Sequence, residues 1–260
     1  MPTALITGAS VGIGRELARL FARDGYDLIL VARDEVRLNE AAQECRSLSG
    51  RDAHVLVADL ARPHAAREIL ERVQAAGWSV NVLVNNAGFG LGGTFAELPL
   101  DRQLDMIQVN VTALVELTHL FLPVIRTAGG GGVLNVASTA AFQPGPWMAI
   151  YYATKAFVLS FSEALAEELS DAGLTVTALC PGPTSTEFQK RAGLSNARMF
   201  ETTSLVVASA ASVARAGYEG FRRGRRVVVP GVINKIHTQS VRFGSRRLVA
   251  KLAAKVNQSK

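Results

Sequence analysis

The chain has 260 residues, of which 48% are hydrophobic and 19% are charged, enough to bury a sizeable core in one large α/β domain or two small ones. No run approaches the ~18 apolar residues of a membrane span, and two cysteines, Cys45 and Cys180, are too few for a disulfide framework. The formal net charge is +6, but no recognition module accompanies it, which argues against nucleic acid as a partner.

The N-terminus gives no sign of export. Its first residues, Met1 to Leu5, enter an apolar run directly, without the basic region and cleavage site of a signal peptide. The surroundings of both cysteines suit reduced, buried thiols. We therefore expect a cytoplasmic protein.

Short apolar runs, rich in Val, Leu and Ile, alternate with long amphipathic stretches. Strands are expected at Thr3–Thr7, Asp27–Ala32, His54–Ala58, Val80–Val84, Gly132–Ala137, Thr175–Leu179 and Arg226–Val229. Helices are expected near 12–24, 35–48, 63–76, 101–127, 152–172 and 212–223. This alternation predicts one doubly wound, Rossmann-type α/β domain over 1–232. Its parallel sheet would have about seven strands, helices on both faces, and ligands at the carboxyl ends of the strands.

Two segments fall outside the alternation. The stretch from Pro181 to about Phe200 is the longest without clear periodicity, and such loops in compact domains tend to be functional lids. The last segment, 233–260, is basic and has apolar residues at helical spacing, which predicts a C-terminal extension that forms an amphipathic helix beyond the last strand. Its charge fits a solvated, soluble face, which we favour, or attraction of an anionic ligand or a membrane surface.

A glycine-rich turn stands between the first strand and the first helix, with the sequence Thr7-Gly8-Ala9-Ser10-Val11-Gly12-Ile13-Gly14. Gly8 permits a tight turn, and Gly12 and Gly14 let the backbone approach a pyrophosphate and pack closely on the sheet. The helix N-terminus that follows supplies unpaired N–H groups and a positive dipole for phosphates. A turn with no ligand is the alternative, but its place after the first strand of a βαβ unit favours a dinucleotide.

A second cluster carries candidate chemistry. Lys155 follows Tyr151 by one helical turn, so both lie on one helix face, and Ser138 precedes the tyrosine by thirteen residues. A nearby ammonium lowers the pKa of a tyrosine, which brings the phenol closer to working pH as a general acid or base. Tyr152 is adjacent, but only Tyr151 has a lysine four residues on, so we assign proton transfer to Tyr151.

Taken together, these pieces resemble the short-chain dehydrogenase/reductase family, over the chain to about residue 231. The matching pieces occur in the family's order: Thr7–Gly14, Asp59, Asn85-Asn86-Ala87-Gly88, Asn110, Ser138, Tyr151-x-x-x-Lys155, and Pro181-Gly182 followed by Thr186. The spacing Gly-x-x-x-Gly-x-Gly differs from the Gly-x-Gly-x-x-Gly fingerprint, and this difference makes the resemblance specific.

The resemblance implies an oxidoreductase that transfers a hydride between NADP(H) and a carbonyl or alcohol. Tyr151 would give the proton, Ser138 would stabilise the developing oxyanion, Lys155 would bind the nicotinamide ribose, and Asn110 would hold a water relay. The implied cofactor-binding residues are Gly8, Ser10, Gly12, Ile13, Gly14, Arg33, Arg37, Asp59, Leu60, Asn86, Ala87, Gly88, Tyr151, Lys155, Pro181, Gly182, Thr184 and Thr186. The four histidines are scattered without ligand spacing, so no metal site is expected.

The end of the second strand favours NADP over NAD. NAD-specific relatives carry an acidic residue where this chain has Ala32, and Arg33 follows, well placed to fork onto a 2′-phosphate. Arg37 lies one helical turn further on and could assist. Asp34 fits this reading if it caps the next helix. Asp59, in the same way, could be a helix cap instead of an adenine contact.

Apolar residues around the expected pocket favour a hydrophobic ketone, an aldehyde, or a substrate of 3-oxoacyl or 3-hydroxy acid type. They are Phe89, Phe95, Phe142, Trp147, Met148, Phe188 and Met199, although several could be core residues. Two other functions stay open: a non-catalytic dinucleotide sensor, which the intact Ser, Tyr, Lys and Asn set argues against, and a membrane-associated lipid-metabolising reductase. The resemblance also implies a homo-oligomer, a dimer or tetramer formed through helices 101–127 and 152–172.

Overall fold

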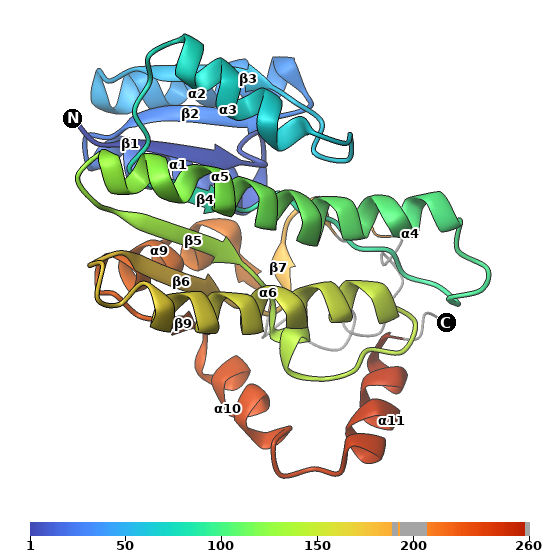
Figure 1. Ribbon diagram of the computed structural model, residues 1–260. Helices are drawn as coiled ribbons and strands as arrows, with labels where there is room; N and C mark the ends of the chain where they lie inside the picture. The colour runs from blue at the N-terminus through green and yellow to red at the C-terminus, as the bar shows by residue number, and fades with distance from the viewer. Residues whose placement is uncertain (189–191, 193–206, 258–260) are drawn as a thin grey trace.

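The computed structural model describes residues 1–188, 192 and 207–257 (Figure 1). In this part of the chain seven parallel strands form one sheet in the order β3-β2-β1-β4-β5-β6-β9. The strands are β1 (Thr3–Thr7), β2 (Asp27–Ala32), β3 (Ala53–Val57), β4 (Val82–Asn85), β5 (Gly132–Val136), β6 (Thr175–Leu179) and β9 (Val227–Val228). The expected doubly wound, Rossmann-type sheet is confirmed.

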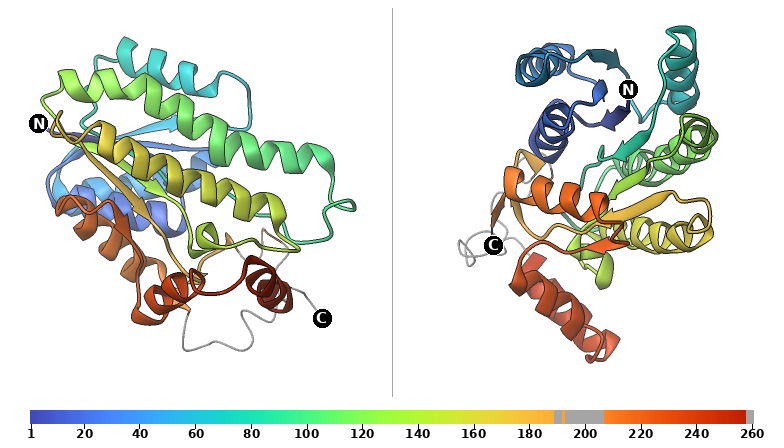
Figure 2. Two further views of the ribbon diagram at one scale, coloured as in Figure 1. Left: turned by 60° about the horizontal axis from the view of Figure 1, so that its bottom comes forward. Right: turned by 90° about the vertical axis from the view of Figure 1, so that its left-hand side faces the viewer.

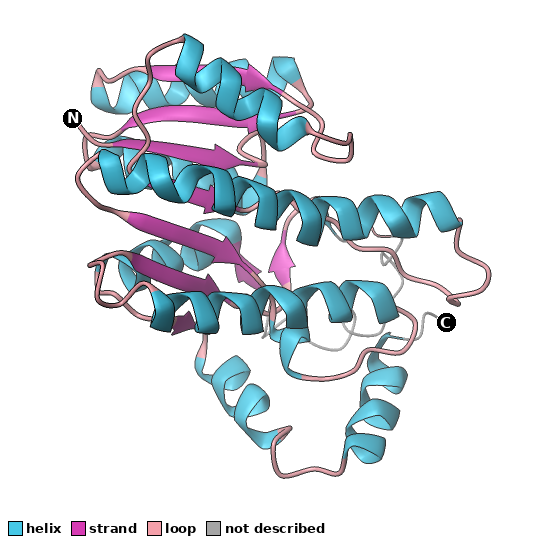
Figure 3. Ribbon diagram, in the orientation of Figure 1, coloured by secondary structure: helices cyan, strands magenta, loops and turns pink. Residues whose placement is uncertain are grey.

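Helices cover both faces of this sheet (Figures 2 and 3). They are α1 (Gly12–Arg23), α2 (Glu35–Ser49), α3 (Ala65–Ala75), α5 (Ala113–Thr127), α6 (Ala149–Glu168) and α9 (Ala210–Arg222). One apolar layer, which includes Phe21, packs α1, α2 and α9 on the sheet, and a second, which includes Phe121, packs α3, α5 and α6 on the other face. Because side chains alternate along a strand, Ile6 of β1 points into the first layer and Leu5 into the second.

A long helical run crosses the second face. It consists of α4 (Leu100–Ile107), the π-helical turn η1 (Gln108–Thr112) and α5. Among the described residues, Leu100–Thr127 is the one helix long and apolar enough to cross a membrane by length and composition alone. Its side chains Leu117, Phe121 and Ile125 belong to the core, so packing on the sheet accounts for part of this apolarity.

The C-terminal extension differs from the single helix expected. It forms two helices, α10 (Val232–Ser240) and α11 (Arg246–Asn257), which make a V beside the sheet (Figure 1). The break follows from the sequence between them, because Gly244 weakens a helix and the Ser245 hydroxyl accepts from the backbone N–H of Leu248 at 3.3 Å. A serine in that role starts a new helix.

The expected lid falls mostly outside the described residues, since 189–191 and 193–206 are not described. On either side of it, β7 (Thr184–Ser185) and β8 (Ala208–Ser209) pair in parallel as a small second sheet. The turn η2 (Thr139–Phe142) follows β5. These short elements and the ends of β1, β4 and β5 surround the site.

Candidate active site

A cavity of about 1460 Å³ opens at the carboxyl ends of the strands. The strand order reverses between β1 and β4, which is where doubly wound sheets bind their ligands. The cavity is lined by most of the residues expected from the sequence: Gly8, Ser10, Gly12, Ile13, Arg33, Asp59, Leu60, Asn86, Ala87, Gly88, Ser138, Tyr151, Lys155, Pro181, Gly182, Thr184 and Thr186. Three expected residues, Gly14, Arg37 and Asn110, are not among the described residues that line the cavity.

The glycine turn packs tightly against the end of β4. Gly8 and Gly12 have φ values of 65° and 58°, in the left-handed region that favours glycine. A Cβ on Gly14 would lie 2.3 Å from the carbonyl oxygen of Gly8 and 2.4 Å from Nδ2 of Asn86. Gly14 is therefore required for packing beneath the turn.

Hydrogen bonds from β4 hold the turn in place. The Thr7 hydroxyl oxygen accepts from the backbone N–H groups of Asn86 and Ala87, each at 3.0 Å. The Asn86 amide donates to the carbonyl oxygens of Thr7 and Gly8, at 2.9 and 3.1 Å. The Asn86 side chain thus stabilises the turn, while its backbone neighbour Ala87 lines the cavity.

The start of α1 is left open toward the cavity. Its N-cap residue is Val11, which offers no side-chain cap, so first-turn N–H groups are not capped by a side chain. Gly12 and Ile13 line the cavity at this point. Unpaired N–H groups and a helix dipole beside a glycine cradle suit the pyrophosphate of a dinucleotide.

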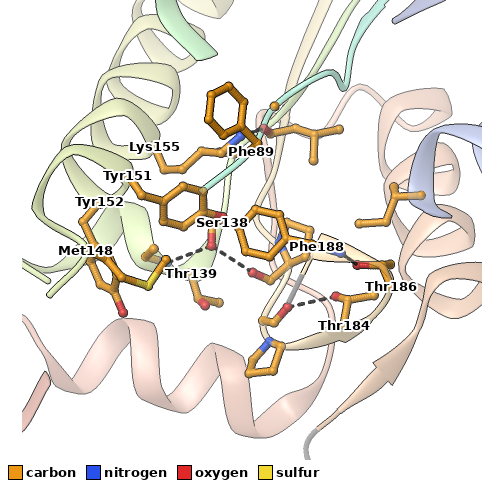
Figure 4. Close-up of a pocket in the computed structure, with 18 of the residues that line it drawn as sticks. Phe89, Ser138, Thr139, Met148, Tyr151, Tyr152, Lys155, Thr184, Thr186 and Phe188 are labelled. Atoms are coloured by element: carbon orange, nitrogen blue, oxygen red, sulfur yellow. Dashed lines mark hydrogen bonds between the residues drawn. The ribbon is translucent and has the colours of Figure 1, made fainter. Parts of the chain in front are cut away.

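Ser138, Tyr151 and Lys155 converge on the cavity from the end of β5 and from α6 (Figure 4). Lys155 is buried and donates from Nζ to the carbonyl oxygen of Val136 at 2.8 Å. The same Nζ lies 5.9 Å from the centre of the Tyr151 ring. Ser138 lies beside Tyr151 (Figure 4), where its hydroxyl donates to the carbonyl oxygen of Pro181 at 3.4 Å and its Oγ accepts from the backbone N–H of Ala140 at 3.1 Å.

Burial sets the pKa values of this pair. It raises the pKa of Tyr151 to about 12, against the opposing effect of the Ser138 hydroxyl, and it lowers the pKa of Lys155 to about 8. The sequence led us to expect that Lys155 lowers the pKa of Tyr151. That expectation is not met in this structure, because desolvation of the phenol is the largest influence. At neutral pH Tyr151 is a neutral phenol and can donate a proton.

Asn110 is buried behind the lysine, in the π-helical turn η1. Its amide donates to the carbonyl oxygen of Phe89 at 3.0 Å and to the hydroxyl of Thr154 at 3.1 Å, and its Oδ1 accepts from the Phe89 N–H at 3.1 Å. A Cβ on Gly88 would lie 3.0 Å from that Oδ1 and 3.4 Å from Nζ of Lys155. The structure thus brings Asn110 and Lys155 to the same small space, as π-helical turns at functional sites often do.

Comparison with known proteins identifies the family. The family model for short chain dehydrogenases matches residues 2–196. The chain belongs to this family. Sulfoacetaldehyde reductase 2 of Chromohalobacter salexigens is 40% identical over 187 residues, which cover 71% of this chain and 73% of that protein.

Solved members of the family share the fold over nearly the whole chain. A short-chain dehydrogenase from Sphingobium yanoikuyae in complex with NADPH has 37% identity and a TM-score of 0.82, with 95% of each chain covered. The bulky-bulky ketone specific alcohol dehydrogenase from Comamonas testosteroni has 33% identity and a TM-score of 0.77, with 94% of this chain and 93% of that one covered. A member from Burkholderia phymatum in complex with NAD also matches, with 25% identity, a TM-score of 0.79 and 92% of each chain covered.

In this short-chain dehydrogenase the second strand ends at Ala32 without an acidic residue. Arg33 follows, with 63% of its side chain exposed and Nη1 3.8 Å from Oδ2 of Asp59. Asp34 caps α2 by accepting from the backbone N–H of Arg37 at 3.1 Å. Arg33 and Asp34 both line the cavity at this strand end, and the Asp34 carboxylate is engaged as the cap of α2.

Arg37 is placed differently from Arg33. Its guanidinium makes two bonds to the Glu187 carboxylate, at 2.8 and 2.9 Å, and Glu187 raises the pKa of Arg37 further. This ion pair joins α2 to the segment after β7. The expected contact of Arg37 with the cofactor stays a prediction.

Apolar side chains line the cavity beside Tyr151. Phe89, Met148 and Phe188 lie there with Tyr151 (Figure 4), and the Phe188 ring centre is 5.3 Å from that of Tyr151. These positions agree with the sequence-based expectation.

Other expected wall residues lie elsewhere. Phe95 and Trp147 line a separate, much smaller cavity. Phe142 packs against a different part of the core, which includes Val158. It is not among the described residues that line the main cavity. Met199 lies outside the described residues.

The C-terminal extension supplies a further wall that the sequence did not assign. Apolar residues of α10, α11 and the turn between them line the cavity: Ile233, Val241, Leu248, Val249, Leu252, Ala253 and Val256. Asn257, at the end of α11, is buried. Its Oδ1 accepts from the Tyr152 hydroxyl and its Nδ2 donates to the carbonyl oxygen of Pro146, each at 3.0 Å. Tyr152 thus anchors this wall.

Two residues of the site were missed from the sequence. Thr154 accepts from Asn110 and donates to the carbonyl oxygen of Tyr151 at 2.7 Å. It lies inside the Tyr-x-x-x-Lys motif, and that position was the available signal. Asn257 carried no local signal, because its partner Tyr152 is 105 residues away.

Proposed function

We propose that this short-chain dehydrogenase is an NADPH-dependent reductase of the carbonyl group of an apolar substrate: a ketone, an aldehyde or a 3-oxoacyl compound. The observation that carries the proposal is the convergence of Ser138, Tyr151 and Lys155 on one cavity, between the glycine cradle and an apolar wall. NADPH bound at the cradle supplies the hydride.

The protein's own residues account for the proton. Tyr151 is protonated at neutral pH because burial raises its pKa to about 12, so it can donate to a carbonyl oxygen that gains negative charge. Ser138, which lines the cavity beside Tyr151, donates to the same oxygen and stabilises the developing charge. The Lys155 ammonium then stabilises the phenolate that remains.

Asn110 and Thr154 position the part of α6 that carries Tyr151 and Lys155. Their hydrogen bonds to each other, to Phe89 and to the backbone of Tyr151 fix the helix face that carries Tyr151 and Lys155. Restoring the proton to Tyr151 needs a path from solvent. The position of Asn110 close to Lys155 supports a water relay at this point.

The proposed preference for NADPH rests on Arg33. Arg33 is exposed beside the end of β2 and within 3.8 Å of Asp59, and Asp34 is held as the cap of α2. A guanidinium there can bind a 2′-phosphate through two hydrogen bonds. Related structures hold NADPH in one case and NAD in another, so the preference is decided by measuring KM for both cofactors.

The substrate class rests on the cavity wall. Phe89, Met148 and Phe188, with the apolar residues of α10 and α11, make the space beyond Tyr151 apolar. An apolar wall favours a hydrophobic substrate. The relatives are named for substrates as different as sulfoacetaldehyde and bulky ketones, so the wall supports a class and not one compound.

We also expect a cytoplasmic homo-oligomer. The helices that relatives use for assembly correspond here to α4, α5 and α6. Leu100, Leu104 and Phe157 on these helices are exposed, which suits burial between subunits. Sedimentation velocity tests this: a dimer or tetramer is expected, and a monomer at micromolar concentration contradicts it.

A substrate screen tests the proposed function. NADPH oxidation is followed with purified protein against ketones of increasing apolar size, aldehydes, a sugar and 3-oxoacyl thioesters. The proposal predicts turnover that improves with apolar size. Turnover limited to the sugar, or no turnover with any carbonyl compound, overturns it.

A further inference from the structure

The extension formed by α10 and α11 holds the whole excess charge of the protein. Residues 232–257 contain six basic residues and no acidic one: Lys235, Arg242, Arg246, Arg247, Lys251 and Lys255. With Lys260 they make seven of the 28 basic residues, so the rest of the chain has 21 against 22 acidic residues. The positive charge is therefore a local property of this V-shaped segment.

The turn between the two helices exposes a large aromatic side chain. Phe243 is 91% exposed and belongs to the turn 241–245 between α10 and α11. This turn is the apex of the V and lies away from the sheet (Figure 1). Arg242 precedes it, and Arg246 and Arg247 begin α11. An aromatic ring at a projecting apex among arginines is the arrangement that enters the boundary between lipid headgroups and acyl chains.

Further apolar side chains extend from this apex along both helices. Val232 and Ile236 of α10 are exposed, as are Leu248, Leu252 and Val256 of α11, although these last three also line the cavity. Exposed apolar side chains among basic ones suit an interaction surface. From the sequence we favoured a solvated, soluble face for this segment. Such a face explains the basic residues but not the exposed apolar side chains.

A bilayer explains the charge better than a second copy of the chain does. A twofold contact through the same surface would bring the same cations together, with no acidic side chain in 232–257 to pair with them. An anionic bilayer offers lipid phosphates for the arginines and an apolar interior for Phe243. Charge complementarity thus selects the membrane as occupant.

We propose that α10, α11 and the turn 241–245 form a docking surface for an anionic lipid bilayer. Phe243 enters the headgroup boundary, and Arg242, Arg246 and Arg247 bind lipid phosphates. The same two helices and their turn line the cavity through Ile233, Val241, Leu248 and Leu252. If the proposed reduction is correct, an apolar substrate dissolved in the bilayer reaches the active site past these helices.

Vesicle flotation with the full-length protein tests the contact without any turnover. Binding to vesicles of phosphatidylglycerol and phosphatidylcholine is expected, with weaker binding to phosphatidylcholine alone and loss at high salt. The triple variant Arg242→Gln, Arg246→Gln, Arg247→Gln is expected to lower the affinity by at least about tenfold. The matched control Arg62→Gln, Arg67→Gln, Arg126→Gln removes three exposed cations elsewhere and is expected to bind as the wild type does.

A tryptophan at the apex distinguishes insertion from attraction to any polyanion. Phe243→Trp is expected to show a blue-shifted fluorescence and quenching by brominated lipid on anionic vesicles, and neither effect with heparin. Phe95→Trp, at another exposed phenylalanine, is the control and is expected to show neither with either partner.

Three results overturn the docking surface. The first is absence of binding to anionic vesicles at low salt. The second is equal loss in the triple variant and its control. The third is a triple variant that dissociates an oligomer of the wild type in the absence of lipid, which assigns the surface to a second copy of the chain. NADPH oxidation with a water-soluble ketone is measured in parallel and is expected to be unchanged in these variants, so failure of the docking surface and failure of the proposed reaction are distinguishable.

Discussion

The hydroxyl of Tyr152 donates a hydrogen bond of 3.0 Å to Oδ1 of Asn257, 105 residues later in the chain. Tyr152 directly follows Tyr151 on α6, and Asn257 ends the helix that forms the far wall of the cavity. One buried side chain therefore joins the C-terminal extension to the helix that carries Tyr151. This contact gives Tyr152 a role in positioning the wall.

Replacing Asn257 by alanine removes both of its hydrogen bonds and leaves the Tyr152 hydroxyl and the Pro146 carbonyl without this partner. Unpaired buried polar groups cost about 1–3 kcal/mol each, so we expect Asn257→Ala to lower the free energy of unfolding by about 2–3 kcal/mol. KM for a bulky ketone is expected to rise severalfold, with little change in kcat. Tyr152→Phe, which keeps the Pro146 bond, is expected to show about half the loss of stability. Equal stability of Asn257→Ala and the wild type would contradict this contact.

Lys155 is expected to destabilise the fold at neutral pH. Burial lowers its pKa from 10.5 to about 8, so the folded chain disfavours the ammonium, and the resulting penalty is present below the folded pKa. The penalty falls as pH rises from 8 towards 10.5 and is absent above the unfolded value. Lys155→Met is therefore expected to be more stable near neutral pH, by up to about 3 kcal/mol, although inactive.

The pH dependence of the difference in stability between Lys155→Met and the wild type is the decisive observation. Both proteins are unfolded with urea, without cofactor, near neutral pH and near pH 10, which is about two units above the folded pKa. The extra free energy of unfolding of Lys155→Met is expected to shrink as pH rises. An advantage that grows with pH contradicts the direction of the shift.

Arg33 is expected to determine the choice of cofactor. Arg33→Ser removes the guanidinium proposed to bind the 2′-phosphate, so KM for NADPH is expected to rise by about tenfold to a hundredfold, with KM for NADH nearly unchanged. Arg37→Ser is the comparison, and a smaller effect is expected because Arg37 is paired with Glu187. A wild-type protein that prefers NADH would refute the assignment.

The direction of the reaction is expected to depend on pH through Tyr151. Because burial raises the pKa of this tyrosine to about 12, the phenol needed for reduction persists through neutral pH. The phenolate needed as the base for alcohol oxidation is scarce there. The rate of alcohol oxidation is thus expected to rise with pH across the alkaline range, while the rate of carbonyl reduction is not expected to rise. An oxidation rate that falls between neutral pH and about pH 10 contradicts this sign.

Local patterns predicted the framework of the site. Strands β1, β2 and β6 begin and end where the apolar runs do, because a strand buried on both faces must be apolar throughout. The glycine turn was predictable for a similar reason, since close backbone approach leaves no room for a Cβ at Gly14. Spacing along one helix was enough to bring Tyr151 and Lys155 together.

Long-range contacts and burial were not predictable in this way. The Tyr152–Asn257 and Arg37–Glu187 pairs join segments more than a hundred residues apart, and neither has a local signature. The pKa of Tyr151 was expected to fall because a lysine was near in sequence, but desolvation depends on the depth of the cavity, which appears only in the folded chain. Gly244 is a helix-weakening residue that the sequence displays. The apolar spacing continues on both sides of it, however, and this spacing led to the prediction of one unbroken helix.

The proton-transfer role of Tyr151 is the central claim, and a pair of variants tests it most directly. Tyr151→Phe and Tyr152→Phe each remove one hydroxyl from adjacent residues of α6. We measure the rate of NADPH oxidation with the best ketone of the screen, and NADPH affinity by fluorescence titration. The account predicts that Tyr151→Phe loses turnover by at least about a thousandfold while NADPH affinity is nearly unchanged, and that Tyr152→Phe keeps kcat. Retained turnover in Tyr151→Phe, or its loss in Tyr152→Phe alone, would contradict it.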